Sequence, residues 1–284
     1  MAVNAPPGTH LSDERPRGDI EAQQHLPLQK DTKPSFARHL AQDVSTNHAD
    51  LVFLACYFLS GLCDSSAYRA WGCFVSMQTG NTVFLGLGAS DALNQESYHW
   101  LKALVSITSF IVGSTVYSKT RYLGAQRRRT LIVNFSSQFL LLAIAAFLLQ
   151  AKIIEDSDVV TNNDIFLKLI PLSLVAFQCA GQMAASRLLS FPEIPTTVLT
   201  SLYYDLFSDP GLLQPLSANA KRNRRATAVI AVVGGAITGG WLAKSTGGIS
   251  TALWVAAASK IGISMLWMFW KQDESKAYRS SAGS

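Results

Sequence analysis

After a polar beginning, the chain alternates between long apolar stretches and short polar ones. Six apolar stretches are long enough to cross a membrane as helices. They cover residues of about 51–71, 100–119, 131–150, 166–188, 226–244 and 251–270. A helix of roughly 20 residues matches a hydrocarbon layer of about 30 Å. The pattern therefore predicts an all-α integral membrane protein with about six transmembrane helices.

Composition supports this class. The chain is 49% hydrophobic and 15% charged, whereas a soluble domain usually carries about 25% charged residues. The alternative is a soluble all-α protein with buried helices. Such helices need a polar face, and residues 131–150 contain no charged side chain at all. Membrane helices are therefore favoured.

Two shorter stretches, residues 74–88 and 194–207, carry polar interruptions. The first contains the letters QTGN inside FVSMQTGNTVFLGLG, and the second contains PTTVLTS at 195–201. A backbone that leaves helical geometry inside lipid exposes polar groups, and each costs several kcal/mol. It persists only where protein or a watery cavity surrounds it. These stretches predict two short broken or re-entrant helices.

The loops indicate orientation. Loops 120–130 and 209–225 each carry four basic residues in a cluster, whereas loop 151–165 is acidic. Basic loops face the cytoplasm, so both basic loops are expected there. The stretch at 194–207 must then enter and leave on one side, and both termini are cytoplasmic. In the alternative with eight spans, the two basic loops fall on opposite sides.

An internal repeat relates residues 51–150 to residues 166–270. At an offset of about 120, four small or polar pairs align, namely Gly61 with Gly181, Ser66 with Ser186, Ser76 with Thr197 and Thr79 with Thr200. Each repeat has three spans, so the two halves face opposite ways across the membrane. Such an inverted internal repeat is typical of many secondary transporters.

The broken segments supply candidate substrate-binding residues, because two half-helix ends near the midplane aim at a common point. The candidates are Gln78, Thr79, Gly80, Asn81, Thr196, Thr197 and Thr200. Under the alternative interpretation, these residues only cap two short buried helices.

Asp64 is the other candidate, because a carboxylate inside a span is expensive unless it faces the interior or is paired. It is expected to couple a proton or a cation to transport. Alternatively it is a structural group that Tyr68, Ser65 or the second broken segment holds by hydrogen bonds. Its counterpart in the repeat, Ala184, is apolar, so the halves differ chemically.

Two glycines of the span at 226–244 are spaced for close packing against another helix. Gly235 and Gly239 have a GxxxG spacing that indicates helix packing.

The four cysteines lack ligand-like spacing, so no metal and no cofactor are expected. The net charge of +5 lies largely in the loops beside spans, so nucleic acid is not an expected partner. No motif of a metalloprotease, nucleotide-binding protein or serine hydrolase is present, and an enzyme is not expected.

Three segments together resemble a known family. GLCD at 61–64, FVSMQTGNTVFLGLG at 74–88 and PTTVLT at 195–200 are similar to the YoaK-like membrane proteins. The resemblance covers about residues 50–270. It implies about six membrane helices and a domain of unknown function, with no established activity.

The sequence therefore predicts a membrane domain over 50–271, a disordered polar tail over 1–49 and a short polar tail over 272–284. The most favoured function is a secondary transporter or permease of a small solute, which works by alternating access in a lipid bilayer with a coupling ion. A channel-like or structural membrane protein is the alternative, and an intramembrane enzyme is the third. The substrate, the membrane and the oligomeric state are left open.

Overall fold

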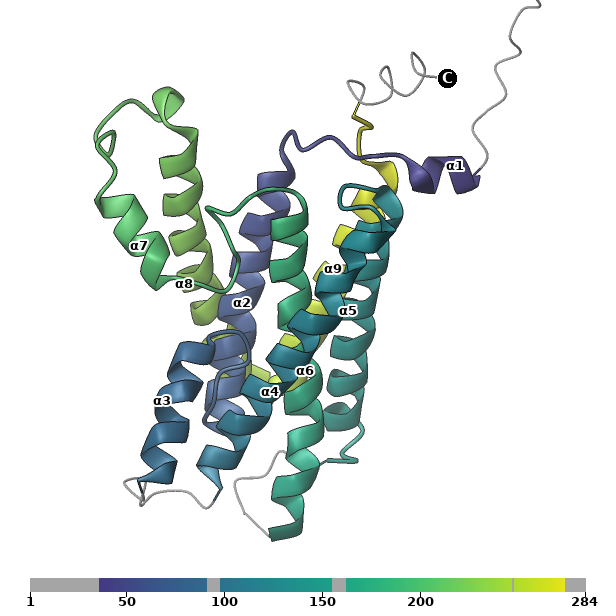
Figure 1. Ribbon diagram of the computed structural model, residues 1–284. Coiled ribbons are helices and arrows are strands. Elements are labelled where there is room, and N and C mark those ends of the chain that lie inside the picture. Colours follow the sequence, from purple (N-terminus) through teal and green to yellow (C-terminus); the bar gives the residue numbers. More distant parts are fainter. Residues whose placement is uncertain (1–35, 91–97, 155–161, 247, 274–284) are drawn as a thin grey trace, which may run out of the picture. The chain divides into compact units, whose positions relative to one another are not determined.

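The computed structural model describes residues 36–90, 98–154, 162–246 and 248–273, and this part of the chain is helical without strands. Six long helices form the bundle in Figure 1, namely α2 (Ala49–Trp71), α4 (His99–Ser118), α5 (Arg128–Gln150), α6 (Asn162–Leu188), α8 (Ala220–Thr246) and α9 (Ile249–Phe269). The shorter elements are α1 (Phe36–Ala41), α3 (Gln78–Ala89), α7 (Thr200–Phe207) and the 3-10 helices η1 (Lys119–Leu123) and η2 (Leu216–Ala218).

The predicted fold class is confirmed. Six helices of the described chain are long and apolar enough to cross a membrane, and each coincides with a predicted apolar stretch. The helices begin a few residues earlier than predicted, most clearly α8, which starts at Ala220 and includes the basic residues expected in a loop. Among these residues, Lys221 is exposed, whereas Arg222 is buried and donates to the carbonyls of Gly211, Leu212 and Gln214 in the preceding loop.

The two short helices cannot cross a membrane. At about 1.5 Å per residue, α3 with 12 residues and α7 with eight reach about 18 and 12 Å. Non-helical chain precedes each of them, at 72–77 and 189–199. We call residues 72–89 the first broken segment and residues 189–207 the second broken segment.

Left-handed backbone conformations end the preceding helices. Gly72 (φ 73°) terminates α2, and its amide donates to the Tyr68 carbonyl. Glycine adopts this conformation without a steric penalty. The second broken segment has Ser190 (φ 62°) and Thr196 (φ 67°) in the same region. This left-handed conformation is uncommon for residues with a Cβ atom, so the surrounding contacts must hold this segment in place.

The broken segments approach the bundle from opposite ends. In Figure 1, α3 runs away from the middle of the bundle toward the end at which α4 begins. Helix α7 runs the other way, toward the end at which α8 begins. The two basic loops and α1 lie at this second end, which we call the basic end of the bundle.

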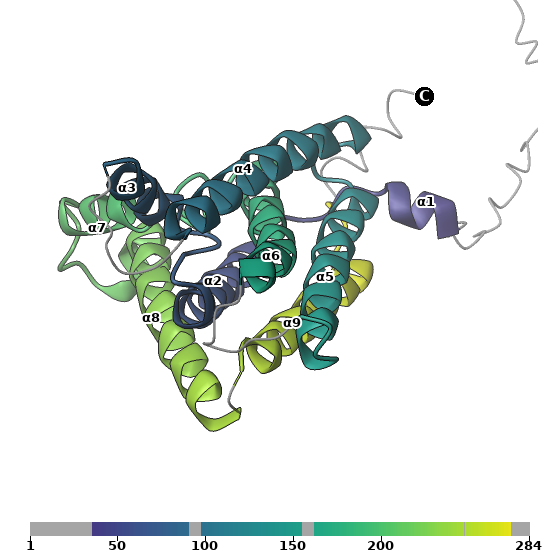
Figure 2. The ribbon, with the colours of Figure 1, turned by 90° about the horizontal axis from the view of Figure 1, so that it is seen from below.

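Helices α2 and α6 form the centre of the bundle. Along their apolar windows, 67% of α2 and 61% of α6 are buried, against 22–44% for the other four spans. Figure 2, a view along the bundle, shows the other spans arranged around these two. Helix α2 packs on α8, α4 packs on α6, and α5 packs on α9.

The contact between α2 and α8 depends on glycine. A Cβ atom at Gly235 would meet the Phe58 carbonyl oxygen, and one at Gly239 would lie 2.6 Å from the Leu62 carbonyl oxygen. On the other side, a Cβ at Gly61 would meet the backbone of α8. The structure thus places both glycines of the predicted GxxxG spacing against the backbone of α2.

The described parts of the two predicted tails contact each other. Val44, which is fully buried, forms an isolated bridge with Gln272, and Asp43 forms one with Arg127. Part of the segment predicted to be a disordered tail is therefore ordered against the bundle from Phe36 onward. Residues 1–35 and residues 274–284 lie outside the described residues.

Candidate functional site

Asp64 holds the first broken segment. Its Oδ1 atom accepts hydrogen bonds from the backbone amides of Val75 and Ser76, each at 2.8 Å, and its Oδ2 accepts one from the Ser76 hydroxyl at 2.5 Å. The side chain is 3% exposed. The structural alternative named Tyr68, Ser65 or the second broken segment as partners, but the observed partners belong to the first broken segment. Ser65 donates within its own helix to the Leu62 carbonyl.

Asn81 organises the turn that precedes α3. Its Oδ1 accepts from the Phe74 amide at 2.9 Å, and its Nδ2 donates to the Phe74 carbonyl at 2.7 Å. Nδ2 also lies within hydrogen-bonding distance of Gln78 Oε1 and Ser106 Oγ. Ser106 itself donates to the Phe74 carbonyl at 2.7 Å. The side chains of Asn81 and Gln78 thus bind the backbone groups of Phe74 and Val75 that the break in the helix leaves without helical partners.

Thr79 and Gly80 lie apart from this network. Thr79 is exposed, and a Cβ on Gly80 would come within 2.7 Å of the Phe74 ring. Gly80 therefore permits the aromatic ring to pack across the start of α3. Among the described residues, neither makes a hydrogen bond to Asp64, so the first broken segment brings together only part of the predicted set.

The second broken segment is held by both central helices. Ser186 of α6 donates to the carbonyls of Phe191 and Ile194 at 2.9 and 3.0 Å. Ser60 of α2 donates to the Thr196 carbonyl at 2.8 Å. Thr196 is fully buried, and its hydroxyl has no hydrogen-bond partner among the described residues.

The other two threonines of this segment differ in environment. Thr197 is 7% exposed and its hydroxyl lies 3.7 Å from the Met183 sulfur. Thr200, the first residue of α7, is exposed. Among the predicted threonines, Thr196 and Thr197 therefore face the interior of the bundle, whereas Thr200 does not.

A buried lysine extends the polar centre. Lys260, the twelfth of 21 residues in α9, is 1% exposed. Its Nζ donates to Gln182 Oε1 at 2.6 Å, and Gln182 Nε2 donates to Ser60 Oγ at 2.5 Å. A hydrogen-bonded chain thus runs from Lys260 through Gln182 and Ser60 to the Thr196 carbonyl. Helices α9, α6 and α2 and the second broken segment all contribute to it.

The charge of Lys260 has no acidic partner nearby. Among the described residues, no carboxylate lies within 4.0 Å of the lysine Nζ. Its remaining contacts are soft ones, with the Cys56 sulfur at 3.8 Å and the Phe135 ring at 5.4 Å from the centroid. A charge at this depth is rare and typical of functional positions.

Sequence analysis missed Lys260, although a signal was present. It is the only charged residue in the predicted span 251–270, and an ionisable residue inside a span is a functional candidate by default. The contacts of Gln182 and Ser60 had no comparable signal, because single polar residues are frequent in membrane helices.

More hydrogen-bonding capacity is left open on α5 and α6. Gln138 donates to Asn134 Oδ1 at 2.5 Å, but Gln138 Oε1 and Asn134 Nδ2 have no partner among the described residues. Gln178 Oε1, one turn before Gln182, is likewise buried and unpaired there. Buried polar atoms are normally satisfied by protein or ordered water, so the bundle centre can bind water or a polar solute.

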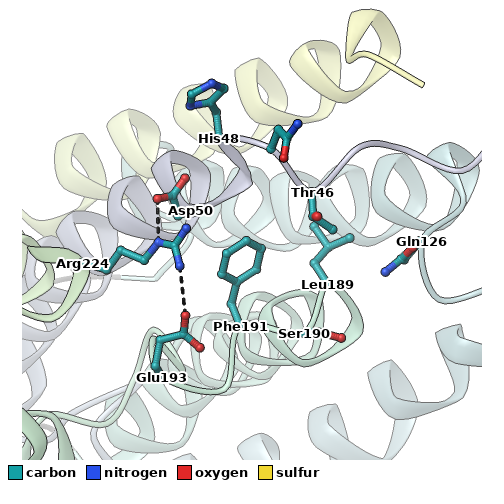
Figure 3. A pocket seen from close by; sticks show the side chains of 10 residues that line it. Thr46, His48, Asp50, Gln126, Leu189, Ser190, Phe191, Glu193 and Arg224 are labelled. Carbon is teal, nitrogen blue, oxygen red and sulfur yellow. Dashed lines mark hydrogen bonds and ion pairs between the residues drawn. The ribbon is translucent and has the colours of Figure 1, made fainter. Parts of the chain in front are cut away.

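A polar pocket lies above the second broken segment at the basic end. Its volume is about 500 Å³. Figure 3 shows the Arg224 side chain reaching between Asp50 and Glu193. The Arg224 Nε lies 2.8 Å from Asp50 Oδ2, and its Nη1 lies 3.2 Å from Glu193 Oε1. The guanidinium also lies 5.3 Å from the centroid of the Phe191 ring. Arg224 of α8 therefore ties the second broken segment to the first turn of α2.

The described residues contain no group of three metal-ligating side chains. The chemistry of the centre is instead that of one carboxylate, one ammonium group and several neutral amides and hydroxyls. Such groups can bind and orient a small polar solute.

The fold and its centre define a multi-pass helical membrane protein with two broken segments. The chain belongs to the family described as "Protein of unknown function (DUF1275)", whose model matches residues 52–266. This is consistent with the resemblance to YoaK-like proteins. Neither the comparison with curated proteins nor that with solved structures gave a match.

Proposed function

We propose that the protein is a secondary transporter, or permease, of a small solute that works by alternating access. One observation carries the proposal. Two non-helical segments from opposite ends of the bundle meet the same helix, α2, one turn apart at Ser60 and Asp64. Broken helices of this kind commonly form the midplane sites of secondary transporters.

An inverted repeat accounts for the packing of the spans. If α2 corresponds to α6, α3 to α7, α4 to α8 and α5 to α9, most contacts between these helices have a counterpart. The contact of α8 with α9 is the exception, because α4 and α5 make no comparable contact. The pair α2–α8 corresponds to α6–α4, α3–α4 to α7–α8, and α5–α6 to α9–α2, while α5–α9 corresponds to itself. This correspondence supports two halves of opposite orientation, which rock against each other during transport.

Glycine contacts support the same correspondence. Gly113 of α4 approaches α6 so closely that a Cβ would lie 2.5 Å from the Phe177 carbonyl oxygen. Gly235 and Gly239 of α8 approach α2 in the same manner. In the sequence, Gly113 aligns with Gly239 at an offset of 126, slightly larger than the offset of about 120 between the broken segments. Both halves then have a small residue at the equivalent helix crossing.

The orientation follows from charge. Both basic loops and the two described chain ends lie at the basic end of the bundle (Figure 1). Because basic loops are retained on the cytoplasmic side, we place this end and both termini in the cytoplasm. The pocket at Arg224 is then the cytoplasmic entrance, and its ion pairs close that entrance above the second broken segment.

In this mechanism the buried charges have separate roles. Asp64 accepts the coupling cation or proton next to the first broken segment. Lys260, with Gln182 and Ser60, orients the solute beside the second broken segment. Thr196 and Thr197 supply hydroxyls at that position. The proposal includes no chemical step on the solute, and no enzymatic activity is proposed.

The test is gradient-driven uptake by proteoliposomes. The purified protein is reconstituted, and pools of amino acids, carboxylates, sugars and polyols are screened under a proton or sodium gradient. Wild-type protein should accumulate at least one pool. Asp64→Asn should abolish accumulation with the fold intact, because an asparagine keeps an oxygen that can accept from the Val75 and Ser76 amides. Ser65→Ala is the matched control, since Ser65 bonds only to its own helix.

The alternative is a channel-like or structural membrane protein whose broken segments are architectural. The closed hydrogen-bond network of Asn81, Gln78 and Ser106 favours it, because these groups already satisfy one another. The alternative would be supported over the transporter by two results together. The solute crosses the membrane without accumulating against a gradient, and its flux is unaffected by Asp64→Asn.

A further inference from the structure

A second cavity, distinct from the pocket at Arg224, lies between α4 and α6 near the basic end. We refer to it as the α4–α6 cleft. Its volume is about 560 Å³, which is in the range of about 300–1,000 Å³ that is usual for ligand sites. The proposed transport function uses neither its arginines nor its apolar wall.

The cleft exists because two helices cross and then separate. Gly113 of α4 sits against the Phe177 carbonyl of α6, and no larger residue could allow this approach. Beyond the crossing, Figure 1 shows α4 diverging from α6 toward η1. Ser114 and Tyr117 of α4 and Ala180 and Met183 of α6 line the open space.

The cleft is divided between an apolar part and a cationic part. Ala180, Met183 and Ala184 form the apolar wall, and Ala180 is 1% exposed at its deep end. Arg121 and Arg187 lie on opposite sides of the part nearer the basic end. Both are exposed, and neither has a carboxylate within 4.0 Å among the described residues.

The surroundings place the cleft at the level of lipid headgroups. Tyr122, which is 77% exposed, lies under the Arg121 guanidinium at 5.2 Å, and such aromatic residues mark the membrane interface. On the outer face of α4, Val112 and Val116 are 54% and 48% exposed, which is typical of a surface in contact with acyl chains. The cleft therefore opens where lipid can reach it.

We propose that the α4–α6 cleft binds one anionic phospholipid, with the phosphate between Arg121 and Arg187 and an acyl chain along Ala180, Met183 and Ala184. Two exposed guanidinium groups complement a phosphate group, and the apolar wall complements an acyl chain. A basic pocket between membrane helices on the cytoplasmic side is a recurrent site for anionic lipids. A free phosphate would use only the cationic part.

Native mass spectrometry of the full chain in detergent tests this. Dioleoyl phosphatidylglycerol is titrated against dioleoyl phosphatidylcholine, with glycerol 3-phosphate as the isolated headgroup. Phosphatidylglycerol should bind more tightly than phosphatidylcholine. Each cation contributes about five-fold to affinity, so R121Q/R187Q should lower it by roughly thirty-fold. K221Q/K271Q removes the same charge from the basic end outside the cleft and should change affinity by less than about two-fold.

Two further variants keep the outcome interpretable. R121K/R187K retains the charge and should retain most of the affinity, and A184F fills the apolar wall without changing charge and should also weaken binding. Equal binding of the two phospholipids, or unchanged binding by R121Q/R187Q, would overturn the proposal. Glycerol 3-phosphate that binds as tightly as phosphatidylglycerol would overturn it too and indicate a site for a soluble anion.

Discussion

Ser60 and Asp64 lie one helical turn apart on α2, and each holds a different broken segment. Ser60 Oγ donates to the Thr196 carbonyl at 2.8 Å, and Asp64 Oδ1 accepts from the Val75 amide at the same distance. One face of a single helix therefore positions two segments that are 120 residues apart in the chain. Any movement of α2 relative to one segment changes its contacts with the other.

Loss of the Asp64 side chain as a hydrogen-bond acceptor should destabilise the protein more than loss of its charge alone. Asp64→Ala leaves the buried amides of Val75 and Ser76 without an acceptor, at about 1–3 kcal/mol each. Asp64→Asn retains an acceptor oxygen and should unfold within about 1 kcal/mol of wild type. Denaturation of the purified variants in mixed micelles measures the difference. If both variants lost the same unfolding free energy, the charge of Asp64 and not its role as an acceptor would hold the first broken segment.

The hydrogen bonds that link Lys260, Gln182, Ser60 and the Thr196 carbonyl should be energetically coupled. Ser60→Ala removes the donor to Thr196, and Lys260→Met removes the donor to Gln182. Because Gln182 joins the two sites, the double variant should be less destabilised than the sum of the single variants, by about 0.5–3 kcal/mol. A double-mutant cycle of unfolding free energies measures this coupling, and strictly additive effects would contradict the chain.

Gly235 offers a matched comparison within α8. Gly235→Ala directs a methyl group at the Phe58 carbonyl, so α8 must separate from α2 at a cost of about 1–3 kcal/mol. Gly240→Ala meets nothing within 4 Å and should change the unfolding free energy by about 0.5 kcal/mol or less. Both variants are measured in the same detergent. Identical effects would show that the glycine contact does not limit packing.

Loss of the Arg224 ion pairs should loosen the second broken segment locally. The pairs are partly exposed, so their contribution to global stability is limited to about 1 kcal/mol. Arg224→Gln should instead raise amide hydrogen exchange in 189–199 by roughly two- to five-fold. Lys221→Gln, an exposed cation of the same helix, is the control. An unchanged exchange rate in Arg224→Gln would show that the ion pairs of Arg224 do not hold the second broken segment at the entrance.

The apolar pattern was sufficient to predict the six spans, because a length of about 20 residues is set by the bilayer itself. The two short interruptions were also visible, since QTGN and PTTVLTS place polar groups where lipid tolerates none. The spacing of Gly235 and Gly239 indicated a packing face in the same way. Each of these signals is local in the sequence.

The centre of the bundle could be predicted only in part. Asp64 was identified from its charge, but its partners at Val75 and Ser76 depend on how the chain turns back after Gly72. The contact of Ser60 with Thr196 joins residues that no periodicity relates. Lys260 could have been found by the same argument as Asp64, yet its connection to Gln182 depends on the packing of α9 beside α6.

The central claim is that each broken segment enters and leaves on one side, and side-specific cysteine labelling tests it most directly. Arg69 and Ser90 flank the first broken segment, and Ser190 and Ser208 lie at the two ends of the second. All four are exposed, whereas the four native cysteines are buried. In sealed vesicles, single cysteines at 69 and 90 should react with an impermeant maleimide from one side, and those at 190 and 208 from the other. Labelling of 69 and 90 from opposite sides would contradict the account.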